Sequence, residues 1–144
     1  MPYLLIVVKD GAVKGFKTGG MLLRIMLPVY IAVVLIKYSP LMPFLTDLFA
    51  PAMGLFRMPG EAAAPLIFGF FSDEYGAIAA IRGFSFSTAT VTTIAMMNLC
   101  LHSIPVESAI NRKIGFPVWR IILFRIFLAV GVGFLTAWLG GLFL

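Results

Sequence analysis

Residues 83–106 read GFSFSTATVTTIAMMNLCLHSIPV and contain no Asp, Glu, Lys or Arg over 24 positions. The same holds over 19 positions for residues 126–144, which read IFLAVGVGFLTAWLGGLFL, and residues 18–36 carry a single charge, Arg24. A helix needs about 20 apolar residues to cross the hydrocarbon core of a bilayer. We therefore expect three membrane-spanning helices, which cover residues 18–38, 83–106 and 120–144.

The composition of the whole chain argues against a water-soluble domain. Of its 144 residues, 61% are hydrophobic and 12% are charged, whereas soluble domains carry roughly 25% charged residues. The net charge is +5, but the Lys and Arg residues flank the apolar runs, which is typical of membrane-protein loops and not of a nucleic-acid surface. The sequence predicts an all-α integral membrane protein with a single domain over residues 1–144 and no nucleic-acid partner.

Residues 41–82 differ from the spans because Pro and charged residues interrupt them. Pro43, Pro51 and Pro65 divide this segment into apolar stretches that are too short to span. Breaks at membrane depth are tolerated only where protein or a water-filled cavity meets the freed backbone groups, and transporters place binding sites at such broken helices. We expect a broken or re-entrant helical hairpin here, with function concentrated near it.

Residues 1–17 mix apolar residues with Lys9, Lys14 and Lys17 and are too short to span the membrane. They predict an amphipathic helix that lies in the membrane interface. Basic residues concentrate here and in the loop over residues 107–120, so the positive-inside rule places both on the cytoplasmic side of a bacterial inner membrane. The C-terminus would then lie outside.

Three stretches carry a resemblance to a known family. Residues 58–71 read MPGEAAAPLIFGFF, residues 102–107 read HSIPVE, and residues 112–116 read RKIGF and lead to Trp119 and Arg125. Together they resemble the nucleoside-recognition, or gate, family of bacterial membrane proteins. Members of that family form the gates of ferrous-iron transporters, resemble parts of concentrative nucleoside transporters, and occur as paired spore-maturation membrane proteins. The resemblance implies a fold and a class of function, and no particular substrate. The iron-transporter gates carry a cysteine in their motifs; neither residues 58–71 nor residues 102–107 hold one, which argues against iron.

Glu61 is the first candidate for a binding residue. It follows Pro59 and Gly60, so we expect it in the first turn of a half-helix, where the helix dipole favours a carboxylate. It either has this structural role or binds a proton or cation, because ionisable groups within membrane segments are costly and usually mark a functional site.

Polar residues in the 83–106 run supply the other candidates. Asn98 lies one helical turn before His102, and Thr88 and Thr92 fall on roughly the same face. We expect Glu61, Asn98 and His102 to approach one polar cavity near the middle of the membrane, with the two threonines as further solute ligands. The structural alternative is hydrogen bonding between helices.

A further group of residues is expected to shape or gate the site. This group is Pro59, Gly60, Pro65, Pro105 and Glu107. Pro105 is expected to end the helix that carries His102, and Glu107 would then lie at the cytoplasmic surface as an ion-pair partner of Arg112 or Arg125.

Small residues recur every four positions in the last apolar run. They are Ala129, Gly133, Ala137 and Gly141. Such a series lets another helix approach closely, either from the same chain or from a partner. Three crossings hardly enclose a pathway, so we expect a homo-oligomer, most plausibly of inverted topology, or a heteromer with a second gate-family protein.

These features favour a gate unit that forms half of a transporter for an unidentified polar solute or ion. The alternative is a non-transporting membrane subunit that supports or regulates a partner protein. We expect no enzyme, because no nucleophile motif is present, and no cofactor. We also expect no metal site, because a lone His with distant carboxylates and a single cysteine, Cys100, falls short of the three or four ligands that zinc requires.

Overall fold

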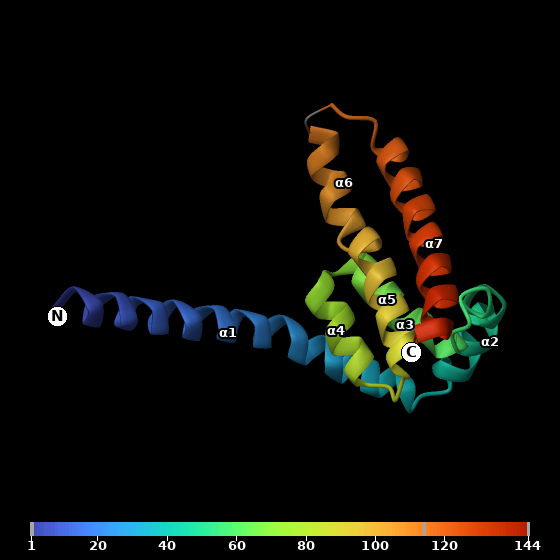
Figure 1. The fold of residues 1–144 in the computed structure, drawn as a ribbon, viewed down its shortest axis with the longest axis horizontal. Helices are drawn as coiled ribbons and strands as arrows, with labels where there is room; N and C mark the ends of the chain where they lie inside the picture. The colour runs from blue at the N-terminus through green and yellow to red at the C-terminus, as the bar shows by residue number, and fades with distance from the viewer. Residues whose placement is uncertain (1, 114, 144) are drawn as a thin grey trace.

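The computed structural model describes residues 2–113 and 115–143, which form helices and no strand (Figure 1). In chain order the elements are α1 (Pro2–Lys37), α2 (Leu41–Gly54), the 3₁₀ helix η1 (Gly60–Ala62), α3 (Ala63–Phe71), α4 (Glu74–Arg82), α5 (Thr88–Leu101), α6 (Ile104–Lys113) and α7 (Val118–Phe143). Three stretches are long and apolar enough to cross a membrane: Ile6–Lys37, Thr88–Lys113 and Val118–Gly140. The prediction of an all-α membrane protein with three spans is confirmed.

The start of the chain differs from the sequence prediction. Residues 1–17 and 18–38 were expected as an interfacial helix and a separate span, whereas α1 runs from Pro2 to Lys37 without a break. Gly19 and Gly20, which follow Lys17 closely, could end a helix there, but α1 continues through them and through Pro28. A location of the first residues in the membrane interface stays a prediction.

Only the C-terminal part of α1 packs against the rest of the molecule. Figure 1 shows its N-terminal part projecting away from the other helices, with Phe16 85% exposed. Near its other end Val33 is fully buried, and a Cβ atom on Gly83 would lie 2.8 Å from the Val33 side chain. Lys37 Nζ donates a hydrogen bond of 2.8 Å to the Gly83 carbonyl. Gly83, which ends α4, is therefore the close contact between α1 and α4.

The predicted break over residues 41–82 takes the form of four short elements, α2, η1, α3 and α4. Gly60 lies so close to α2 that a Cβ atom there would overlap the backbone carbonyl of Thr46. Pro59 caps η1 in an extended conformation, and Pro65 is buried in the first turn of α3. These residues of the 58–71 stretch thus hold the start of α3 against α2.

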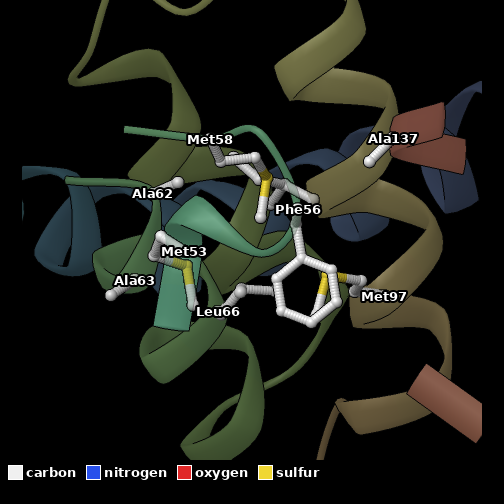
Figure 2. Packing of buried hydrophobic residues seen from close by; sticks show 9 residues of the cluster. Met53, Phe56, Met58, Ala62, Ala63, Leu66, Met97 and Ala137 are labelled. Carbon is white, nitrogen blue, oxygen red and sulfur yellow. The ribbon is translucent and has the colours of Figure 1, made fainter. Parts of the chain in front are cut away.

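The core joins the 58–71 stretch to α5 and α7. Its buried members are Met53, Phe56, Met58, Ala62, Ala63, Leu66, Ile94, Met97 and Ala137 (Figure 2). Alanines at the helix contacts let backbones approach closely, and the flexible methionines fill the remaining space.

The small residues of α7 pack inside the same chain. Ala129 and Ala137 are buried, and a Cβ atom on Gly133 would lie 2.7 Å from the sulfur of Met97 on α5. The surroundings of Gly141 fall outside the described side chains. This face of α7 is therefore covered by α5, and a partner chain would have to use another surface.

We predict that Gly60→Ala lowers the stability of the protein in detergent. The new Cβ meets backbone atoms of Thr46 that cannot rotate away, and overpacking of this kind typically costs about 1–3 kcal/mol. The thermal unfolding midpoint measures the effect. Gly15→Ala is the matched control, since nothing lies within 4 Å of a Cβ there, and it should leave the midpoint unchanged or raise it. Equal midpoints for the two variants would contradict the close contact at Gly60.

Candidate functional site

The membrane span over residues 83–106 is broken, and the break lies at His102–Ser103. The helix was expected to end at Pro105; α5 ends slightly earlier, at Leu101, and Pro105 lies in the first turn of α6. The reason is the missing N–H of Pro105, which in a continuous helix would bond the carbonyl of Leu101. Ser103 takes a left-handed conformation, with φ at 53°, and so turns the chain from one helix into the next.

Ser103 ties this break to the end of α3. Its backbone N–H donates a hydrogen bond of 3.1 Å to the Gly69 carbonyl, and its hydroxyl donates one of 2.6 Å to the Ser72 carbonyl. The end of α3, the start of α4 and the α5–α6 break therefore meet at one place. We call this place the junction and define it by Ser72, Glu74, His102, Ser103, Glu107 and Arg125.

Arg125 of α7 closes the junction. Its Nε donates a hydrogen bond of 2.6 Å to the Cys100 carbonyl, and Nη2 donates one of 3.0 Å to the His102 carbonyl. Its third contact is an ion pair with the Glu107 carboxylate. Carbonyl groups at a helix C-terminus carry partial negative charge, so a guanidinium there satisfies them and stabilises the end of α5. Of the two arginines expected to pair with Glu107, the structure selects Arg125.

His102 lies between two carboxylates that come from different helices. Its Nδ1 is 3.7 Å from a carboxylate oxygen of Glu74 on α4, and its Nε2 is 3.8 Å from one of Glu107 on α6. Nδ1 also lies 3.0 Å from the Leu99 carbonyl, which favours the tautomer with a proton on Nδ1. With neutral His102 the three side chains Glu74, Glu107 and Arg125 sum to −1, and protonation of the imidazole brings the sum to zero.

Asn98 lies one turn before His102 and is only 4% exposed. Its amide rests on Gly69 of α3, where a Cβ atom would overlap it. The amide oxygen has no hydrogen-bond partner among the described residues. Asn98 also lines a groove of about 170 Å³ between α4 and α5, whose other walls are Glu74, Ala77, Ile78, Ile81, Ala95 and Leu99. An unpaired buried amide typically costs about 1–3 kcal/mol, which makes Asn98 a candidate for binding a further polar group.

The structure does not bring all predicted site residues together. Glu61 is exposed in η1, at the N-terminal end of α3. His102 lies beside Glu74, which follows the C-terminal end of α3. The nine residues of α3 span about 13 Å. Thr88 and Thr92 are also exposed, and the hydroxyl of Thr92 bonds the Thr88 carbonyl of its own helix. Of the residues expected in one cavity, only Asn98 and His102 are neighbours.

The threonines show why the helical pattern did not identify the site. The buried hydroxyl residues of α5 are Thr90 and Thr93, on another face of the helix from Thr92. A threonine can satisfy its hydroxyl on the carbonyl four residues earlier, as Thr92 and Thr93 both do, so the side chain needs no polar surroundings. A row of hydroxyls therefore does not reveal which helix face meets a cavity.

Glu74 and Arg125 are functional candidates that the sequence analysis missed. Asp73 and Glu74 follow α3, and Asp73 caps α4 by accepting a hydrogen bond of 2.9 Å from the Gly76 N–H, as an acidic pair before a helix suggests. Arg125 was visible as a charge within a long apolar helix, which by itself indicates a functional or structural role. Neither signal shows that the two side chains lie beside His102.

No three His, Cys, Asp or Glu side chains among the described residues are grouped closely enough to hold a metal ion. The junction instead offers hydrogen-bonding and proton-accepting groups around a helix break, and it includes His102, Ser103 and Glu107 of the HSIPVE motif.

Comparison with known proteins identifies the family. The profile of the Gate family, described as nucleoside recognition, matches residues 21–115. The chain belongs to the Gate family. The match includes Glu74, Asn98, His102 and Glu107, whereas Arg125 lies beyond it. The chain is also 36% identical, over 119 residues, to an uncharacterized membrane protein of Bacillus subtilis (strain 168), YvoD. This alignment covers 83% of the chain and 38% of YvoD, so the gate domain described here spans well under half of that relative's length. No solved structure matches the chain.

We predict that Arg125→Gln strongly destabilises this gate-family protein. The change leaves Glu107 without its cation and two carbonyls without their donor, and each hydrogen bond lost from a charged group typically costs about 1.5–3 kcal/mol. The midpoint of thermal unfolding in detergent measures this loss of stability. Arg82→Gln, at an exposed position in α4, is the control.

The double variant Arg125→Gln/Glu107→Gln sharpens this test. It removes the unpaired carboxylate, so it should recover part of the stability lost in Arg125→Gln. If Arg125→Gln and Arg82→Gln unfold at the same temperature, Arg125 does not hold the junction together.

Proposed function

We propose that this protein is a gate unit of the bacterial inner membrane and forms half of a transporter for a polar solute or ion. The observation that carries the proposal is the cluster of Glu74, Asn98, His102 and Glu107 beside a helix break in a Gate-family membrane protein. Broken helices with polar groups at membrane depth are where transporters bind their substrates.

The exposure of the cluster supports contact with a water-filled cavity. The side chains of His102, Glu74 and Glu107 are 27%, 46% and 42% exposed in the single chain. An ionisable group that faces lipid near the bilayer centre is penalised by at least about 2.5–3.5 kcal/mol on insertion scales. We therefore propose that the junction faces water or a partner chain instead of lipid, and that the solute meets Asn98 and His102 there.

The proposal excludes a catalytic step. Ser103 is the hydroxyl residue next to His102 in sequence, and its hydroxyl already donates to the Ser72 carbonyl, so His102 does not activate it as a nucleophile. The chemistry of the cluster is the exchange of protons and hydrogen bonds with a passing solute.

The described residues form three candidate spans, which hardly enclose a pathway alone, and this supports the need for a partner. The matched part covers only 38% of YvoD, so a relative in this family carries substantial further chain. We propose that a second copy, or a second gate-family protein, completes the pathway here.

The competing proposal is a membrane subunit that supports or regulates another protein without transporting a solute. The projecting part of α1 favours it, because large apolar residues such as Val8 and Phe16 are exposed along a segment that the other helices leave uncovered. The uptake experiment described next distinguishes the two proposals.

We predict that the protein, reconstituted in proteoliposomes, takes up at least one solute from a panel of radiolabelled polar compounds and ions. Asn98→Ala and His102→Gln should each reduce this uptake at least about tenfold, which is the effect of losing one hydrogen bond to a charged group. Thr92→Ala is the control and should keep full uptake, because its hydroxyl bonds only its own helix.

All three variants should unfold at temperatures close to that of the unchanged protein. Uptake that is unaffected by Asn98→Ala and His102→Gln would show that the solute passes elsewhere. Absence of uptake across the panel, with a correctly folded oligomer, would favour the supporting subunit.

A further inference from the structure

The turn between α6 and α7 carries a second, independent cluster of residues. The two helices diverge toward this turn in Figure 1, and a cleft of about 540 Å³ lies between them. Its walls are Ser108, Ala109, Arg112, Phe116, Val118 and Trp119. The cleft lies at the opposite end of α6 from the junction.

Three cations lie at the ends of the two helices that form this cleft: Arg112 is one of its walls, Lys113 follows Arg112, and Arg120 follows the wall residue Trp119. Arg112 and Lys113 lie in the last turn of α6, and Arg120 lies in the first turn of α7. All three are exposed, and within the described part of the chain no carboxylate lies within ion-pair distance of them. The nearest acidic residue along the chain, Glu107, is already paired with Arg125.

The helix dipoles explain the position of only two of these charges. Cations at the C-terminal end of α6 are stabilised by the partial negative charge there. Arg120 lies at the N-terminal end of α7, where the dipole disfavours a cation, and its guanidinium carbon is 5.4 Å from the centroid of the Trp119 ring. An anion in the cleft would be attracted both by the positive charge of Arg120 and by the partial positive charge at the N-terminus of α7.

The location identifies the kind of anion. The candidate spans end at Lys113 and begin again at Val118, so the cleft lies where both helices leave the apolar layer. Trp119 and Phe116 are 61% and 54% exposed, as is usual for aromatic side chains at the level of lipid head groups. A ligand that offers a negative head group to the cations and a hydrocarbon chain to Ala109, Phe116 and Val118 matches both parts of the cleft.

We propose that the α6–α7 cleft is a binding site for a phospholipid with an anionic head group, with Arg112, Lys113 and Arg120 on the head group and Trp119 beside the acyl chain. Basic pockets between membrane helices bind anionic head groups in this way. A zwitterionic lipid is a poor substitute, because the cation of its own head group competes with the three side chains for the phosphate. The proposal does not depend on the transport function.

Tryptophan quenching by brominated lipids tests the proposal on the full chain. The chain has two tryptophans, so Trp138→Phe leaves Trp119 as the only tryptophan. In mixed vesicles, brominated phosphatidylglycerol should quench Trp119 at a lower mole fraction than brominated phosphatidylcholine does, by roughly fivefold for each cation that engages the head group.

Substitution of the three cations provides the second arm. Arg112→Gln/Lys113→Gln/Arg120→Gln, in the Trp138→Phe background, should abolish the preference for the anionic lipid. Lys9→Gln/Lys14→Gln/Lys17→Gln removes the same amount of charge from α1 and should retain the preference for the anionic lipid. If the first triple variant does not fold, Arg120→Gln alone should reduce the preference by roughly fivefold.

Three results would overturn the proposal. Equal quenching by the two brominated lipids in the Trp138→Phe protein shows no lipid selectivity. Equal loss of preference in the two triple variants shows an effect of net charge only. Complete competition by inorganic phosphate at physiological ionic strength assigns the site to a free anion instead of a lipid.

Discussion

A backbone interrupted within a membrane span must have its freed polar groups satisfied by protein, because lipid offers no hydrogen bonds. The rest of this structure depends on how the break between α5 and α6 meets that requirement. Pro105 interrupts the helical hydrogen bonds, Arg125 from α7 donates to the Cys100 and His102 carbonyls, and Ser103 donates to the end of α3. One break thereby fixes the relative positions of four helices.

The same requirement explains why the polar candidates lie where they do. Ser103 can reach the Gly69 carbonyl only if α3 and α5 are in close contact, and the absence of a side chain at Gly69 permits that contact while it leaves room for the Asn98 amide. His102 is the last residue before the turn, so its ring projects between α4 and α6, beside Glu74 and Glu107. The structural contacts of the break therefore also assemble the proposed solute site.

Much of the fold follows from the sequence, but the membership of the site does not. Uninterrupted apolar runs predict spans, and closely spaced prolines predict the short helices over residues 41–82, because both depend on local properties of the chain. Asn98 and His102 are recognisable as neighbours because they are one turn apart. Glu74 and Arg125 reach His102 from 28 and 23 positions away, and only the packing of α4 and α7 determines those contacts. Glu61 was grouped with His102 because its place at the start of a helix does not show which end of that helix packs beside His102.

The central claim is that the junction is a wet, polar site inside a membrane protein. Labelling of single cysteines with a charged, membrane-impermeant thiol reagent in intact membranes tests it most directly. In a Cys100→Ser background, which removes the chain's single cysteine, His102→Cys and Glu74→Cys should react, whereas Leu139→Cys, on an exposed apolar face of α7, should stay unlabelled. Labelling of His102→Cys and Glu74→Cys that is no faster than that of Leu139→Cys would contradict the account.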